Sequence, residues 1–251
     1  MVGPADAPGR EGAWVSPVEG DAAAAGSASR RRPGPRRSLD RTKVLDAAVG
    51  LLDEGGPEAL SIRAVAGRLG VNPNAVYTYV ASRSALEREI VERVFAESEL
   101  ELLTGPAPRW RSRLVSYTRS LRSVLLRHPA VAGLLMTAPI DGPSAVLIGE
   151  RVLAALRDAG LAPDDAARGT YALIVQVVGF VALEVAETDG RPPLAPEAER
   201  IAARRAALEF LDPADWPLSA ATRDVAAGWI STDQFDWSVE RLLDGLVQRA
   251  G

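Results

Sequence analysis

Residues 61–80 of the chain read SIRAVAGRLGVNPNAVYTYV, and this stretch predicts a pair of short helices. Apolar residues recur at helical spacing up to Gly70, and a second segment with helical spacing begins at Pro73. Ser61 and Asn72 precede the two segments as N-caps, and proline is favoured at the first helical position. Two short helices joined by a tight turn that contains glycine are typical of a helix-turn-helix.

The segment before this motif predicts a longer helix with one apolar face. Asp40 is its N-cap, and Gly55–Gly56 is its stop signal. After the motif, Ser82 caps a further helix that repeats apolar residues at every fourth position and is expected to reach Leu103. The apolar face of the first helix consists of Val44, Leu45, Ala48, Leu51 and Leu52.

The rest of the chain also shows helical spacing, and no segment alternates apolar and polar residues as a strand does. Within the longest expected helix, Tyr171–Val185 is apolar nearly all round, which is typical of a central or interface helix. Asp189–Pro196 is rich in proline and is expected to be a mobile loop. The protein is therefore predicted to be all-α. Helices are expected near residues 109–127, 129–136, 144–159, 163–187 and 237–249.

The composition changes along the chain, and these changes predict three parts. Residues 1–37 are rich in Gly, Ala, Pro and Ser without periodicity, and we expect a disordered arm with a basic cluster. Residues 38–103 are expected to form the helix-turn-helix domain. Thr104–Pro108, with one Gly and two Pro, predicts a boundary before a larger helical domain over residues 104–251.

The formal net charge is −4, which by itself is unusual for a protein that binds nucleic acid. The charge is unevenly distributed, however, because residues 30–93 carry 12 basic and 8 acidic side chains. Five arginines fall within residues 30–37, and Pro33–Pro35 interrupt their run, so the cluster is expected to be extended. Taken alone, this cluster is either a solvated linker or an arm that binds DNA. The arginines are Arg30, Arg31, Arg32, Arg36 and Arg37.

The composition also argues against an enzyme. The chain has no cysteine and a single histidine, so thiolate chemistry is excluded and zinc sites or Ser–His nucleophiles are disfavoured. Asp164–Asp165 is the only adjacent pair of aspartates, and after Pro163 it is explained by the start of a helix. An all-helical enzyme is nevertheless one alternative, and a dimeric small-molecule-binding protein without DNA affinity is another.

No run of apolar residues reaches the length of a membrane span, and the N-terminus lacks the order of a signal peptide. We therefore expect a cytoplasmic protein without a membrane partner. No cofactor and no metal are expected.

The second helix of the motif has an unusual outward face. Val76 and Val80 are expected to point into the core. The outward residues combine short hydrogen-bonding groups with phenols, whereas a plain solvated helix carries mostly Glu, Lys and Arg. A DNA contact explains this face, and a structural adaptor does not. The outward residues are Asn74, Ala75, Tyr77, Thr78 and Tyr79.

Residues 40–90 resemble the DNA-binding domain of the TetR family of bacterial transcription regulators. The downstream part, with Arg127–His128–Pro129 and Glu240–Leu246, is similar to the regulatory domain of the tetracycline-repressor-like branch. The N-terminal resemblance is carried by Val44–Ala48, Leu51–Gly56, Ser61–Ala66, Leu69–Val71, Ala75–Val80 and Arg83–Leu86.

The resemblance implies a set of DNA contacts. Some family members send an N-terminal arm into the minor groove, which adds the arginine cluster to this set. Two alternatives stay open, because Arg63 could pair with an acid of its own domain and Arg83 could be an ordinary exposed residue. The implied contacts are Arg36, Arg37, Ser61, Arg63, Asn74, Ala75, Tyr77, Thr78, Tyr79 and Arg83.

The resemblance further implies a ligand-responsive regulator, usually a repressor, that binds a palindromic operator as a homodimer and is released by a small-molecule effector. One histidine cannot reproduce the magnesium site of tetracycline repressors, so tetracycline itself is not the expected inducer. Gln176 is explained equally well by a helix–helix hydrogen bond, whereas His128, which precedes Pro129, is better explained as a helix-end residue than as a ligand group. The candidate effector contacts are Trp110, Tyr117, His128, Met136, Tyr171, Gln176 and Phe180.

Overall fold

The structure is a computed structural model that describes residues 39–136, 140–187 and 194–248. In these ranges the regular secondary structure is entirely helical, which confirms the all-α prediction. Arg36 and Arg37 lie outside the described residues, as does most of the expected loop 189–196.

Four helices form the N-terminal part, α1 (Arg41–Ala59), α2 (Ile62–Leu69), α3 (Pro73–Tyr77) and α4 (Arg83–Phe95). Each begins at the N-cap that the sequence predicts. The Asp40 carboxylate accepts a hydrogen bond from the Lys43 amide at 2.9 Å, and the Ser61 hydroxyl accepts one from the Ala64 amide at 3.1 Å. Asn72 and Ser82 cap α3 and α4 in the same way. Local side-chain chemistry therefore sets where these helices start.

Helices α1 and α4 are each interrupted or ended near a single residue. Gly56 has φ 68°, so α1 is interrupted at the predicted stop and its last residues form a separate turn. Helix α4 ends at Phe95, well before Leu103, and a short 3-10 helix follows at Leu100–Leu103. The buried Ser98 hydroxyl donates to the Phe95 carbonyl at 2.7 Å and so competes with continuation of the helix.

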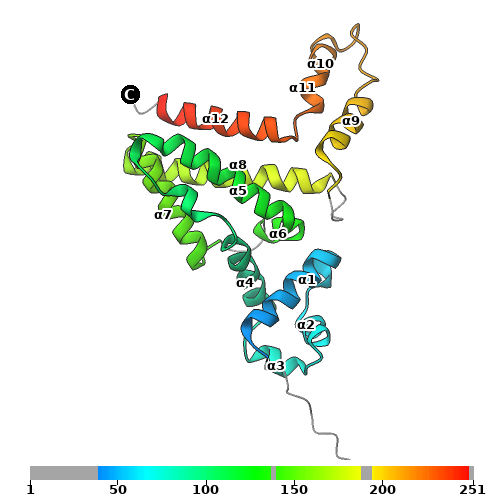
Figure 1. The fold of residues 1–251 in the computed structure, drawn as a ribbon. Coiled ribbons are helices and arrows are strands. Elements are labelled where there is room, and N and C mark those ends of the chain that lie inside the picture. The colour runs from blue at the N-terminus through cyan, green and yellow to red at the C-terminus, as the bar shows by residue number, and fades with distance from the viewer. Residues whose placement is uncertain (1–38, 137–139, 188–193, 249–251) are drawn as a thin grey trace, which may run out of the picture. The chain divides into compact units, whose positions relative to one another are not determined.

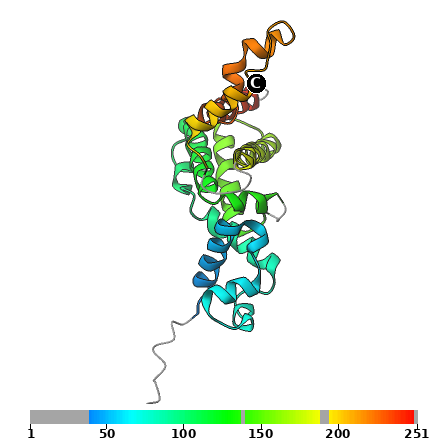
Figure 2. The same cartoon turned by 90° about the vertical axis from the view of Figure 1, so that its right-hand side faces the viewer.

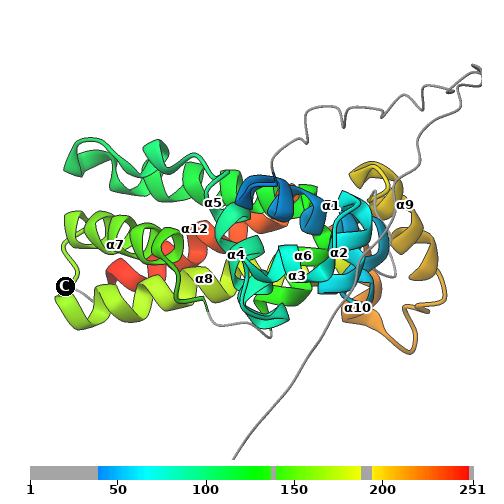
Figure 3. The same cartoon turned by 90° about the horizontal axis from the view of Figure 1, so that it is seen from below.

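The larger part is built on α5 (Trp110–Arg127), which follows a 3-10 turn at Ala107–Arg109, α6 (Pro129–Leu135), α7 (Pro143–Asp158), α8 (Pro163–Ala186) and α12 (Thr232–Gln248). Helix α8 packs against the four others, and α5 and α12 run along it (Figures 1 and 3), whereas α7 is inclined to it in Figure 1. Helix α6 also packs against α1 and α4, so it joins the N-terminal helices to the larger part. Fully buried residues of this core include Leu114, Leu125, Leu156, Val181 and Leu243.

Three short helices between α8 and α12 were not predicted from the sequence: α9 (Glu197–Ala207), α10 (Pro217–Ala221) and α11 (Arg223–Ala227). We call residues 197–227 the projection. In both Figure 1 and Figure 2 the projection and helices α1–α3 lie at opposite ends of the part described from residue 39 onward. The sequence gives little sign of α9, because its exposed surface is rich in Ala, Glu and Arg without an apolar stripe.

Two glycines of α2 provide a matched test of the turn. Gly70 caps the helix in the left-handed region at φ 66°, whereas Gly67 lies within the helix with open space around a Cβ. We expect Gly70→Ala to lower the free energy of unfolding by about 1–2 kcal/mol. Gly67→Ala should raise it by roughly 0.5–1 kcal/mol. Urea unfolding of both variants tests this, and equal effects would contradict the cap geometry.

Candidate nucleic-acid interface and effector region

The helix-turn-helix holds α3 by its buried side. Val76 and Val80 are buried in the core to which Val65 of α2 and the apolar face of α1 also belong, and α3 packs against α2. The Val71 amide donates to the Ala66 carbonyl at 3.0 Å, and this bond closes the turn between α2 and α3. The opposite side of α3 faces outward as the sequence predicts, so its side chains are free to meet another molecule.

The residues on that outer side differ in their exposure and in their hydrogen bonds. Asn74, Tyr77 and Thr78 are exposed, with 53% of Tyr77 accessible, and no hydrogen bond from the Tyr77 hydroxyl to another described residue is present. Ala75 is half-buried. Ser61 is also half-buried, and its hydroxyl already serves as the cap of α2.

Tyr79 lies differently from the sequence expectation. It is half-buried, and its hydroxyl donates to the Leu39 carbonyl at 2.6 Å, just before α1. Helix α3 ends at Tyr77, so residues 78–80 turn the chain and direct the ring back toward α1. As a groove contact Tyr79 stays a prediction, and the structure gives it a second role in fixing the start of α1.

The two candidate arginines also differ. Arg63 is exposed on the first turn of α2, and no ion pair involves it within the described residues. Arg83 is exposed at the start of α4, where Nε bonds Glu87 at 2.8 Å and the guanidinium also donates to the Pro57 carbonyl at 3.1 Å. Arg63 therefore has its full donor capacity available, whereas Arg83 is held in place by neighbours.

The larger part contains a small interior cavity of about 30 Å³ between α5, α7 and α8. Tyr117 lines it, and burial raises the pKa of the Tyr117 phenol to about 12, opposed by a bond of 3.2 Å to the Ser98 hydroxyl. The hydroxyls of Thr118 and Thr170 in the wall bond carbonyls of their own helices. The cavity therefore presents neutral and mostly apolar walls. It is lined by Leu114, Tyr117, Thr118, Leu121, Ile148, Val152, Thr170, Leu173, Ile174 and Val177.

A groove of about 240 Å³ runs along α8 beside the end of α6. Met136 and Tyr171 line it and are exposed, and Ile174 lines both the groove and the interior cavity. The groove and cavity thus adjoin at α8. The groove is lined by Leu135, Met136, Ile140, Tyr171, Ile174, Val175, Val178 and Gly179.

The other candidate effector contacts have partners within the protein. The Gln176 amide donates to the Ser238 hydroxyl at 2.8 Å and links α8 to α12, which is the helix–helix alternative left open by the sequence. Phe180 packs edge-on against Phe235, with ring centroids 5.2 Å apart. Arg111 lies over the Trp110 ring at 4.9 Å. Neither cavity nor groove includes these residues, so the predicted set is not gathered at one place.

His128 lies at the junction of α5 and α6, away from the cavity and groove. Its Nδ1 is 3.1 Å from Asp53 of α1, and its Nε2 is 3.3 Å from Glu97 just after α4. Hydrogen bonding to Asp53 raises the pKa of His128, against the opposing effect of burial. The sequence offers two interpretations of His128, a helix end and an effector contact, and the structure places it at the end of α5, between the N-terminal helices and the larger part.

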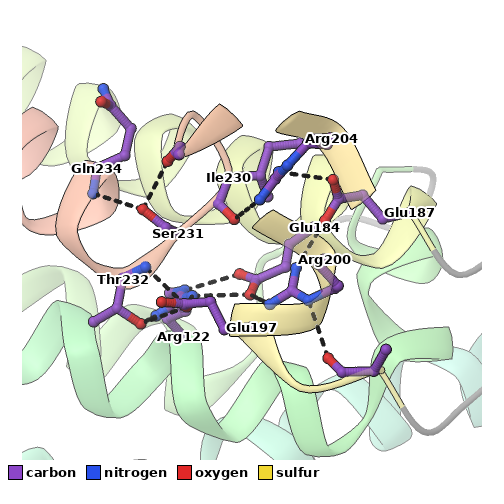
Figure 4. A network of polar contacts seen from close by, with 12 residues as sticks. Arg122, Glu184, Glu187, Glu197, Arg200, Arg204, Ile230, Ser231, Thr232 and Gln234 are labelled. Carbon is purple, nitrogen blue, oxygen red and sulfur yellow. Dashed lines mark hydrogen bonds and ion pairs between the residues drawn. The ribbon is translucent and has the colours of Figure 1, made fainter. Parts of the chain in front are cut away.

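A buried ion-pair network anchors the projection (Figure 4). Glu184 of α8 is 1% exposed and accepts two bonds of 2.9 Å from Arg122 and one of 2.8 Å from Arg200. Arg200 and Arg204 also bind Glu187, and the Arg204 guanidinium donates to the Ile230 carbonyl before α12. Burial opposes the charge of Arg200, but its bonds to Glu184 and Glu187 prevail and raise its pKa. The network joins α5, α8 and α9 to the start of α12.

The fold and the surface of α3 define a class of protein. A helix-turn-helix with an exposed polar and phenolic helix is joined through α6 to a helical part with an apolar cavity. This is the architecture of a DNA-binding transcription regulator with a separate ligand-binding region.

Comparison with known protein families supports this class. Residues 44–90 match the model of bacterial regulatory proteins of the tetR family, and residues 104–250 match the tetracyclin repressor-like C-terminal domain. The chain belongs to the TetR family, and it is a ligand-responsive transcriptional regulator of the repressor type.

Individual relatives cover most of the chain. An HTH-type transcriptional regulator of Saccharopolyspora erythraea is 32% identical over 216 residues, which is 85% of this chain and 86% of that protein. The HTH-type transcriptional repressor DrrR1 of Streptomyces coeruleorubidus is 32% identical over 230 residues, 88% of this chain and 84% of that protein.

A solved structure is similar over nearly its whole length. The Streptomyces coelicolor TetR family protein ActR, in complex with actinorhodin, aligns with a TM-score of 0.72 at 25% identity. The alignment covers 85% of this chain and 99% of ActR.

Arg63 and Arg88 allow a charge-matched test of the DNA face. Both are exposed, but Arg63 lies on the first turn of α2 and Arg88 lies within α4. We expect Arg63→Ala to weaken binding to operator DNA by about 1–3 kcal/mol, as loss of a base or phosphate contact does. Arg88→Ala removes the same charge and should change affinity much less. Gel-shift titration measures both affinities. Equal losses of affinity would mean that Arg63 acts only through its charge and not through a specific contact.

Glu184 allows a test of the ion-pair network. Glu184→Gln removes the buried counter-ion of Arg122 and Arg200. These arginines keep Glu197 at 3.6 Å and Glu187 at 2.8 Å, respectively, so the free energy of unfolding should fall by about 2–4 kcal/mol. The control Asp165→Asn breaks the exposed pair with Arg168 and should cost less than about 1 kcal/mol. Denaturant unfolding at one fixed protein concentration compares the two, and a small loss for Glu184→Gln would contradict the anchoring role.

Proposed function

We propose that the protein is a homodimeric repressor that binds a palindromic operator with α3 in the major groove and is released by a small-molecule effector. The observation that carries this proposal is the outer side of α3, where Asn74, Tyr77 and Thr78 are exposed over the buried Val76. Arg63 and Arg83 flank this side, where arginines reach phosphates and bases. In a two-fold dimer the two recognition helices lie about 34 Å apart, one turn of DNA.

Exposed apolar residues support the dimer. Helix α8 is long and apolar enough to cross a membrane, yet only 39% of its most apolar window is buried within one chain. Leu183 on α8 is 62% exposed and Trp237 on α12 is 60% exposed. A second copy that packs on α8 and α12 would cover these residues, and a two-fold interface buries the same patch on both subunits. We propose this occupant rather than a membrane.

The projection adds to this surface. A cleft of about 710 Å³ separates α11 from α12 and is lined partly by Trp229 and Trp237. Phe210 and Leu218 of the projection are also more than two-thirds exposed. Apolar exposure on this scale is typical of an interface. In the proposed dimer the projection therefore contacts the second copy.

The effector is proposed to bind where the groove and the interior cavity adjoin at Ile174. The walls there are apolar, and Tyr117 supplies a neutral hydroxyl, so a largely apolar and uncharged molecule fits best. The similar protein ActR has been solved in complex with actinorhodin, which supports a bound small molecule as the effector. Tyr117, Met136 and Tyr171 remain the candidate contacts in this proposal.

Three further points belong to the proposal. Arg36 and Arg37 are proposed to reach the minor groove next to the operator half-site. The protein is proposed not to be an enzyme, which the names of its relatives as transcriptional regulators support. It is proposed to act in the cytoplasm, where its DNA target is.

Retention of genomic DNA fragments on the purified protein tests the function directly. We expect a small set of fragments, each with an inverted repeat upstream of a gene. Binding without sequence preference would contradict the operator proposal, and sedimentation of the complex as one chain per repeat would contradict the dimer.

Leu183 and Val146 allow a test of the dimer surface. Both are more than 60% exposed, on α8 and α7 respectively. We expect Leu183→Glu to shift the protein toward monomer and to weaken operator binding at least tenfold, because a buried unpaired charge costs well over 1.4 kcal/mol. Val146→Glu makes a similar change outside the proposed interface and should leave the dimer intact. Sedimentation velocity and gel shift report the two effects.

A further inference from the structure

The His128 imidazole, at the end of α5, contacts both α1 and the residues just after α4. It is the one titratable group among the described residues that links these three segments. Asp53 comes from α1, Glu97 follows α4, and Arg127 precedes His128 on α5. The Arg127 guanidinium also donates to Glu97, at 3.3 Å. Helix α6, which packs against this junction, contributes no titratable side chain.

The two ring nitrogens face two carboxylates. An ionised carboxylate only accepts hydrogen bonds, and a neutral imidazole donates from one nitrogen while the protonated ring donates from both. Only the protonated ring therefore satisfies Asp53 and Glu97 together. The second carboxylate oxygen of Asp53, Oδ1, is buried without a partner in the described part of the chain. Asp53 thus depends on His128 for its one side-chain hydrogen bond there.

We propose that protonated His128 is a positioning residue that fixes α1–α4 relative to the larger part by linking Asp53 to Glu97. This inference rests on the proposed function for its consequence in DNA binding. The link lies beside α6, and α6 packs against α1, α4 and α8. Because α8 borders the groove and the cavity, a change at the effector region reaches the N-terminal helices across this junction.

The link also makes the orientation of the helices depend on pH. The ordinary pKa of histidine is 6.5, and the bonds to Asp53 and Glu97 raise that of His128 despite burial. Bonds from His128 and Arg127 likewise lower the pKa of Glu97, although its own burial opposes this. The link is therefore fully formed below the ordinary value and is lost as pH rises through the raised one.

A distance measurement tests the link without DNA or effector. The chain has no cysteine, so Gly67→Cys on α2 and Gly149→Cys on α7 place two spin labels where a Cβ meets no atom within 4 Å. Labelled chain diluted with unlabelled chain reports distances within one protomer. We expect a narrow distance distribution at about pH 5.5 and a broader or shifted one at about pH 8.5, on either side of the histidine pKa.

Variants separate the link from other titrating groups. In the same labelled background His128→Gln should give the broad distribution at both pH values, and Asp53→Asn should resemble it. Arg93→Gln, which breaks the Arg93–Asp46 pair between α4 and α1, is the control and should behave like the parent. His128→Arg keeps a permanent charge and should remove the pH dependence. A parent-like distribution for His128→Gln at both pH values would overturn the proposal.

The pH dependence of operator affinity is a second test of the link. Loosely held helices are binding-competent for a smaller fraction of the time, which weakens apparent affinity. Parent affinity should fall by roughly 5-fold or more between the two pH values, a coupling of ordinary size, while His128→Gln is weak at both. A flat profile in the parent would overturn the consequence for DNA binding. Because the spin labels are read without DNA, failure of the operator proposal leaves the distance result standing, and failure of the link leaves operator binding standing.

Discussion

Helix α8 imposes the main constraint on this structure. It is 24 residues long and apolar on nearly all sides, so water must be kept from most of its length. Helices α5, α6, α7 and α12 each pack against it, and Leu183 remains exposed on the part that they leave uncovered. Burial of one further side chain of this size is worth about 1.5–3 kcal/mol. The need to cover α8 therefore accounts both for the packing within one chain and for the surface proposed to bind a second copy.

The charged network at the end of α8 has a different role. Burial of Arg122 and Glu184 is costly, and such a pair contributes specificity of geometry more securely than net stability. Arg200 and Arg204 extend the pair to α9, a helix without a buried apolar residue. Apolar packing sets the position of α8, and directional hydrogen bonds then set where the projection leaves it. Apolar packing thus acts in the core, and the directional hydrogen bonds act at its edge.

Local signals in the sequence predicted the N-terminal helices well, because a cap such as Asp40 or Ser82 acts on the backbone within three residues. The all-α class and the family are confirmed, whereas the individual contact residues stay predictions. Helix α9 was missed because its partners, Glu184 of α8 and Glu187 just after it, are distant in the sequence and leave no local pattern. Gln176 and His128 show the same limit. Each is a candidate effector contact with an alternative in the sequence, but its spacing does not say whether its partner is a ligand, Ser238 of α12 or Asp53 of α1.

Helix α3 has five residues, which is less than two turns. A helix of this length presents few side chains to the base edges of one half-site, and each good bidentate contact discriminates by only about 1–3 kcal/mol. In the proposed complex of a dimer with a palindromic operator, much of the sequence information therefore comes from the spacing of the half-sites and from the ease with which the intervening DNA deforms. Operators of this regulator are expected to tolerate variation in bases under α3 and to be strict in the length between half-sites. A genome search should accordingly weight spacing above the identity of any single base.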